Sequence, residues 1–118
     1  MNSKFFVPFE TAKALKEKEY SGLCDYYYAP DKQLYFGVTR VSNNTLDYEN
    51  NGTVASPTYH EVVDWFEERK VRIYAEYCKG WYGFIDDSKI MEVETTNNYP
   101  TREQALNEAI LRALKKLT

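Results

Sequence analysis

The sequence has 118 residues, a formal net charge of −3 and an isoelectric point near 5.2. This acidic balance argues against general affinity for nucleic acids or membrane surfaces, because both attract basic proteins. No stretch approaches the ~18 apolar residues of a membrane span, and the N-terminal apolar run is too short for a signal peptide. We therefore expect a cytoplasmic protein that does not enter a membrane, with Cys24 and Cys78 reduced rather than joined in a disulfide.

The spacing of apolar residues predicts an α+β fold, in which an antiparallel sheet of about three to five strands carries helices mainly on one face. The length favours a single domain over residues 1–118. Within it we expect an N-terminal αββ piece (residues 5–41), a loop (42–56) and a unit of αβββα order (57–118).

The N-terminal piece begins with a short amphipathic helix. Pro8 suits the first helical position, and Gly22 is a plausible left-handed cap at the other end. Two runs of strand-forming residues follow, Cys24–Tyr28 and Gln33–Val38, and the turn residues Ala29–Lys32 separate them. This pattern predicts a β-hairpin whose second strand can continue to Val41. The apolar stripe of the helix consists of Phe9, Ala12 and Leu15.

The stretch Ser42–Val54 is rich in asparagine, aspartate and glycine and predicts a long connection. Within it, Leu46 and Tyr48 either tether the connection to the core or mark a short edge strand. Connections of this length in a small domain are either functional surfaces or slack, and we expect slack.

The second helix has a clear start signal. Thr58 is followed three residues later by Glu61, the spacing of a capping box in which each side chain satisfies a backbone N–H of the first turn. The helix is expected to end near Lys70. Its core-facing residues recur at helical spacing, and they are Tyr59, Val62, Val63 and Phe66.

Three runs of alternating character follow the second helix: Val71–Cys78, Trp81–Ile85 and Ile90–Thr95. The connections between them are short, which predicts an antiparallel meander. In the third run, Met91 and Val93 are expected on the face opposite Glu92 and Glu94.

The last helix carries the strongest pattern in the chain. Thr101 and Gln104 form a second capping-box sequence. Three alanines on its apolar side allow close approach to a sheet. Its apolar stripe is formed by Ala105, Leu106, Ala109, Ile110, Ala113, Leu114 and Leu117.

Four segments together resemble a family of small uncharacterised proteins from gut Bacteroides-type bacteria and their phages. They are KFFVPFE (Lys4–Glu10), SPTYHEVVDWFEE (Ser56–Glu68), GWY (Gly80–Tyr82) and YPTREQALNEAI (Tyr99–Ile110). The resemblance covers most of the chain apart from Ser42–Val54. It implies cytoplasmic residence and carriage on mobile elements, and it implies no activity.

The αβββα order is also similar to double-stranded-RNA-binding domains and HicB-type antitoxin domains. Such RNA-binding domains place a lysine cluster at the start of the last helix. Here that position reads Thr101-Arg102-Glu103-Gln104, and Pro57–Thr118 holds nine lysines and arginines against eleven aspartates and glutamates. No RNA-binding residue is therefore carried over. A basic stripe for nucleic acid would have to come from Arg69, Lys70, Arg72, Lys79, Arg112, Lys115 and Lys116.

The sequence predicts no catalytic, cofactor-binding or metal-binding residue, and so no enzyme. His60 is the only histidine, which rules out a cluster of histidine ligands. Adjacent carboxylates such as Asp86-Asp87 point apart and suit turns or solvated faces. A cation site built from Asp86, Glu92 and Glu94 across a hairpin is the remaining metal hypothesis.

The aromatic residues are the strongest functional indication, because the chain has 11 Tyr, 6 Phe and 2 Trp. Strand alternation places some of them on a sheet face that helices on one side cannot cover, so they either form an exposed binding surface or lie under the N-terminal hairpin or the first helix with their hydroxyls in water. We therefore expect a non-enzymatic interaction module that binds a protein partner or a second copy of itself. The alternative is a nucleic-acid-binding domain. The expected surface consists of Tyr26, Tyr28, Tyr35, Tyr74, Trp81 and Tyr82.

Overall fold

The computed structural model of the chain describes residues 3–43, 52–89 and 91–117. The chain forms two compact units, which we call the N-terminal unit (residues 6–58) and the C-terminal unit (the described residues of 1–5 and 59–118). The α+β prediction is confirmed, and the described strands form two antiparallel three-stranded sheets, one in each unit. That the two units make one domain stays a prediction.

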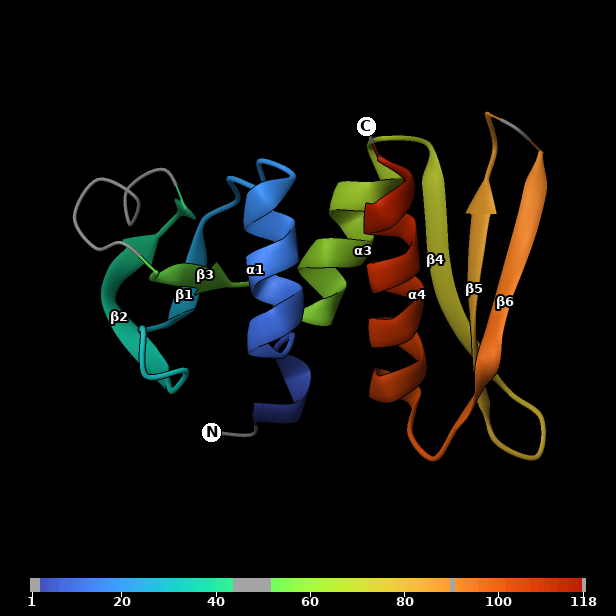
Figure 1. Cartoon of the computed structure of the whole chain (residues 1–118), viewed down its shortest axis with the longest axis horizontal. Coiled ribbons are helices and arrows are strands. Elements are labelled where there is room, and N and C mark those ends of the chain that lie inside the picture. The colour runs from blue at the N-terminus through green and yellow to red at the C-terminus, as the bar shows by residue number, and fades with distance from the viewer. Residues whose placement is uncertain (1–2, 44–51, 90, 118) are drawn as a thin grey trace. The chain divides into compact units, whose positions relative to one another are not determined.

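The N-terminal unit combines α1 (Phe9–Glu17) with β1 (Cys24–Tyr28), β2 (Leu34–Val41) and β3 (Val54–Ser56) in the sheet order β2-β1-β3 (Figure 1). The predicted hairpin of β1 and β2 is confirmed, including the continuation to the end of β2. The third strand, β3, lies inside the stretch expected to be a loop.

The ends of α1 differ from the prediction in their details. Pro8 is the N-cap with extended backbone, and the helix begins one residue later. At the other end Glu19, with φ of 65°, adopts the left-handed conformation, and the N–H of Tyr20 donates to the carbonyl of Leu15. This is a Schellman closure. The prediction that Gly22 supplies the left-handed cap is therefore wrong, because the buried Tyr20–Leu15 pair closes the helix earlier in the chain.

The strand β3 is held by a buried asparagine that the sequence pattern assigned to a loop. The side-chain amide of Asn43 donates to the carbonyl of Tyr20, and its oxygen accepts from the N–H of Ala55, each at 2.8 Å. All three residues of β3 are buried. The connection is thus anchored at both described ends, whereas Leu46 and Tyr48 lie outside the described residues.

The C-terminal unit has the predicted αβββα order. It contains η1 (Ser3–Phe5), α3 (Tyr59–Glu67), β4 (Val71–Tyr77), β5 (Trp81–Asp87), β6 (Glu92–Tyr99) and α4 (Arg102–Lys116). The three strands form an antiparallel meander in the order β4-β5-β6. Both long helices lie on the same side of this sheet (Figure 1). The helical stripe of α3 is confirmed for Tyr59, Val62 and Phe66, which are buried.

The packing of α4 on the sheet depends on a glycine in β5. A Cβ atom at Gly83 would lie 2.3 Å from the carbonyl oxygen of Ala105 and 3.1 Å from the Cβ of Ala109. The predicted close approach through small residues is therefore confirmed. The capping box of Thr101 and Gln104 is also present at the start of the helix.

The third strand lies further along the chain than predicted. Ile90 is outside the described residues, and Met91 occupies a turn with φ of 55° instead of a strand. The strand continues to Tyr99, which pairs with Trp81. The hydroxyl oxygen of the buried Thr96 accepts from the N–H of Gly83 at 2.9 Å where the strand register shifts. This contact keeps in the sheet residues that lie beyond the predicted end of the strand at Thr95.

Candidate functional site

The two faces of the C-terminal sheet are unlike each other. One face packs against the helices and buries Val71, Ile73 and Ile85. In the described part of the chain, neither helix of the C-terminal unit lies on the other face (Figure 1). Strand alternation assigns six residues of β4 and β5 to that second face. We call this surface the open face, and these residues are Arg72, Tyr74, Glu76, Tyr82, Phe84 and Asp86.

An aromatic pair lies at the centre of the open face. Tyr74 and Phe84 are direct cross-strand partners, and their rings stack with centroids 4.9 Å apart and planes 10° apart. The guanidinium of Arg72 lies 4.8 Å from the ring centroid of Tyr74. Both rings remain half-buried rather than buried. The three side chains thus form a preorganised ladder that is still accessible.

Charged groups and an apolar residue border this ladder. Within the described structure, Glu76 and Asp86 make no ion pair, although Asp86 lies opposite Arg72 in the strand register. On β6, Val93 pairs with Asp86 and leaves 57% of its surface exposed. Exposed apolar surface beside unpaired charges is typical of binding surfaces.

The expected interaction residues are distributed over several places. Tyr74 and Tyr82 lie on the open face. Trp81 is on the helix-bearing face by alternation, and its ring contacts that of Tyr77 at 5.4 Å. The other three expected residues belong to the N-terminal unit. That any of them acts in binding stays a prediction. The interaction surface predicted from the sequence did not include Phe84 or Val93, and it considered Arg72 only for a basic stripe. The signal that could have identified Phe84 is its position opposite Tyr74 in the hairpin register.

The tyrosines of the N-terminal unit are engaged within that unit. The ring of Tyr26 contacts those of Phe6 and Phe36 at 4.5 and 5.2 Å. The hydroxyl of Tyr28 donates to the carbonyl of Val7 at 2.8 Å. Burial raises the pKa of this phenol, and a hydrogen bond with Ser56 opposes the shift. These contacts give Tyr26 and Tyr28 a structural role.

Tyr35 has a different environment, since 42% of its surface is exposed. Its hydroxyl donates to a carboxylate oxygen of Asp31 at 2.7 Å. This hydrogen bond lowers the pKa of Asp31 and raises that of Tyr35. The ring stacks on Tyr27 with centroids 5.8 Å apart. Tyr35 therefore stabilises the end of the hairpin, where Asp31 lies in the turn.

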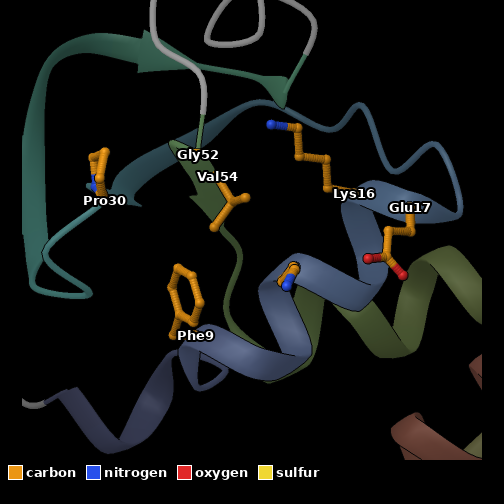
Figure 2. A pocket seen from close by; sticks show the side chains of 7 residues that line it. Phe9, Lys16, Glu17, Pro30, Gly52 and Val54 are labelled. Carbon is orange, nitrogen blue, oxygen red and sulfur yellow. The ribbon is translucent and has the colours of Figure 1, made fainter.

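A hollow of about 510 Å³ lies between α1, the β1–β2 turn and β3 (Figure 2). Phe9, Pro30 and Val54 form its apolar walls, and Lys16 and Glu17 lie on the helix at its border. The ammonium of Lys16 donates to the carbonyl of Thr53 at 3.1 Å. This lysine therefore ties the helix to the start of β3.

The residues considered for catalysis and metal binding do not come together in one site. His60 is exposed and lies 3.5 Å from Asp64 one helical turn away. Asp86 belongs to the open face whereas Glu94, by alternation, faces the helices, so the proposed carboxylate group does not converge. Among the described residues, no cluster of three potential metal ligands occurs. Cys24 is buried, Cys78 is exposed, and the two are not joined in a disulfide.

The cations proposed for a basic stripe are dispersed. Arg72 lies on the open face, whereas Arg112 is bonded to Glu108 at 2.9 Å and to Glu94 at 3.4 Å. Lys116 also pairs with Glu94. The guanidinium of Arg69 covers the ring of Trp65 at 3.8 Å. Carboxylates and rings thus already engage several of the positive charges that a phosphate-binding surface would need.

Comparisons of the chain with protein-family models, with curated proteins and with solved structures found no match. Among the described residues, no helix has the length and apolar character needed to cross a membrane. Any functional conclusion therefore depends on the geometry of the chain itself, in which the open face is the strongest candidate site.

Proposed function

We propose that this chain is a non-enzymatic interaction module that binds a protein surface through the open face. The observation that carries the proposal is the Arg72–Tyr74–Phe84 ladder, which is ordered by cation–π and stacking contacts yet left accessible. Tyrosine, phenylalanine and arginine are enriched in the central parts of protein interfaces. Because these side chains are already held in place, binding loses little conformational entropy.

The charges and ring geometry of the open face favour a protein partner over a nucleic acid. Base stacking needs free ring faces. Here Arg72 and Phe84 both already contact the ring of Tyr74, which leaves less of that ring for a base. Glu76 and Asp86 would also repel phosphates. A partner with apolar side chains and charged groups at its border suits this surface better.

The proposal also covers the cellular location of the protein and the kind of genetic element that carries its gene. The acidic charge balance and the resemblance to small Bacteroides-type bacterial and phage proteins support a cytoplasmic accessory protein carried on mobile elements. Among the described residues no group of three potential metal ligands occurs, and the proposal assigns the chain no enzymatic activity.

A photo-crosslinking experiment tests this function. A benzophenone amino acid replaces Val93, which is exposed beside the ladder, and the full chain is irradiated in cells that carry its gene. We expect an adduct of one discrete mass with a polypeptide. The same probe at the exposed Lys115 on α4 should give no such adduct.

A second substitution connects the adduct with the open face. Thr95 is exposed and lies opposite Phe84, so Thr95→Lys adds a long charged side chain at the centre of the surface without disturbing a buried group. The Val93 adduct should be lost in this variant, while the circular dichroism spectrum stays the same. An adduct that persists in Thr95→Lys, or the absence of any discrete adduct, would overturn the proposed function.

A further inference from the structure

The charged side chains of β4 are placed symmetrically about the aromatic centre of the open face. Arg72 precedes Tyr74 by two residues, and Glu76 follows it by two. All three therefore lie on the same face of the strand. A cation and an anion thus flank the ring at equal distances of about 7 Å along the strand.

The strand β5 repeats this arrangement. Tyr82 and Asp86 flank Phe84, again two residues to either side. Asp86 lies opposite Arg72 in the register, and Tyr82 lies opposite Glu76. One end of the open face therefore carries the guanidinium and a carboxylate, and the other end carries a carboxylate and a phenolic hydroxyl.

This pattern is complementary to itself under a two-fold rotation. If the axis lies in the plane between two open faces and runs across the strands, it exchanges the two ends of the surface. Arg72 of each copy then faces Glu76 of the other, and the hydroxyl of Tyr82 faces Asp86. The aromatic pairs meet at the centre. Each charged group that flanks the ladder gains a partner of opposite charge or a hydrogen-bond donor.

We propose that the partner of the open face is a second copy of this chain, packed face to face in an antiparallel two-fold dimer. This inference rests on the proposed function and names its partner. Glu76 and Asp86 make no ion pair within the described structure of one copy, and the dimer supplies a partner for each.

The dimensions of packed sheets allow these contacts. Sheets stack about 10 Å apart, with strands inclined by about 30°. At about 7 Å from the centre, this inclination moves a residue sideways by roughly 3.5 Å, which long side chains can span. Arginine and glutamate from opposite sheets can therefore meet across the gap.

The size of the surface predicts a weak dimer. Three strands that pair over about seven residues cover about 14 Å by 23 Å, roughly 300 Å² in projection for each copy. Such an area belongs to small, transient interfaces and not to obligate ones. We expect a dissociation constant of about 10–100 µM, which corresponds to roughly 6 kcal/mol.

Charge-reversal variants of the full chain test this arrangement by sedimentation equilibrium. In the two-fold dimer, residue 72 of each copy faces residue 76 of the other. Arg72→Glu therefore creates two pairs of facing carboxylates, and Glu76→Arg creates two pairs of facing guanidinium groups. We expect each variant alone to dimerise at least about tenfold more weakly than the wild type. An equimolar mixture of the two variants should dimerise within about threefold of the wild type, because both pairs are then attractive.

Two controls accompany these variants. Arg102→Glu changes an exposed charge at the start of α4 and should leave the dissociation constant unchanged. Both substituted positions on the open face are exposed, so circular dichroism should show an unaltered fold. A wild-type chain that stays monomeric to about 1 mM, or a mixture no tighter than its components, would overturn the dimer.

The Val93 crosslink separates failure of the dimer from failure of the proposed function. The dimer predicts that purified protein alone gives an adduct of twice the mass of the chain. An adduct with a different polypeptide in cells, together with a monomeric purified chain, would overturn the dimer and leave the proposed function intact. No adduct in either sample would overturn both.

Discussion

In the C-terminal unit each strand pairs with its neighbour in the sequence, β4 with β5 and β5 with β6. In the N-terminal unit the third strand, β3, returns after a long connection to pair with β1. The C-terminal sheet is thus specified by short hairpins, whereas the N-terminal sheet requires a contact between residues far apart in the chain. Non-local pairing costs loop entropy before it gains contacts, and a buried side chain, Asn43, helps to hold it.

The two units also use their aromatic residues differently. In the N-terminal unit, Tyr26 packs between phenylalanine rings, and the hydroxyl of Tyr28 is bonded to a backbone carbonyl. In the C-terminal unit, Tyr74 and Phe84 are ordered by each other and remain accessible. The half-buried rings of Tyr26 and Tyr28 are thus bound to other groups of their own unit, whereas the equally half-buried Tyr74 and Phe84 contact each other and Arg72 on a sheet face that the helices of their unit leave uncovered. In the N-terminal sheet the exposed aromatic residues are Tyr35 and Phe36 of β2.

The largest effect is expected at the contact between α4 and β5. Gly83→Ala places a methyl group 2.3 Å from the carbonyl oxygen of Ala105, so the backbone of the helix or the strand must move. We expect the free energy of unfolding to fall by about 3 kcal/mol or more. Urea denaturation followed by near-ultraviolet circular dichroism measures this loss.

A glycine of the N-terminal unit provides the matched control. In Gly22→Ala the new methyl group would meet the hydroxyl end of Tyr20 at 2.8 Å, and the end of a side chain can shift more easily than a backbone. A loss below about 1 kcal/mol is expected. Equal losses in the two variants would contradict the tighter helix–sheet approach that distinguishes the C-terminal unit.

The next largest effect concerns the non-local strand of the N-terminal unit. Asn43→Ala leaves the carbonyl of Tyr20 and the N–H of Ala55 buried without their partner. Unsatisfied buried polar groups of this kind cost about 1–3 kcal/mol each, so we expect a loss of roughly 2–3 kcal/mol. Hydrogen exchange should accelerate at Ala55 and remain slow at Ile85 in the other sheet.

The control for Asn43 is an asparagine in the C-terminal sheet. Asn98 is exposed, and its amide lies 3.5 Å from the carbonyl of Lys79. Asn98→Ala should change the free energy of unfolding by less than about 0.5 kcal/mol. If Asn43→Ala lowered the free energy of unfolding as little as this variant, the two hydrogen bonds of the Asn43 side chain would not be what holds β3 in the sheet.

The smallest effect is electrostatic and belongs to the C-terminal unit. The hydrogen bond from Lys116, aided by Arg112, lowers the pKa of Glu94 in the folded chain. A lowered folded pKa means that the stabilisation is present above the unfolded pKa, and that it disappears as the pH falls through the folded pKa. Glu94→Gln should therefore destabilise the chain at pH 7 by no more than about 1 kcal/mol, because the pair is partly exposed.

The pH dependence gives this variant its readout. The difference in unfolding free energy between wild type and Glu94→Gln should shrink as the pH falls through the lowered folded pKa of Glu94 and vanish below it. Glu92→Gln on the same strand is the control, because among the described residues no cation pairs with Glu92. A difference independent of pH would show that Glu94 acts through packing instead of charge.

The elements that could be predicted from the sequence are those whose signals are local. The capping box at Thr101 and Gln104, the helical stripe through Leu106 and Ile110, and the short hairpins of the C-terminal sheet all followed from residues within a few positions of one another. Backbone N–H groups at a helix start must be satisfied nearby, so such signals remain valid in any tertiary context.

Features that depend on distant residues became evident only in the folded chain. Asn43 is loop-like in isolation and becomes a clamp because Tyr20 and Ala55 come together around it. Thr96 lies beyond the predicted end of the third strand at Thr95, and it stays in the sheet through its contact with Gly83. For the candidate site, the sequence indicated the aromatic residues but not which face of the sheet the helices cover. The side on which each aromatic residue lies relative to the helices depends on strand register and helix placement, which are fixed by packing across the sheet.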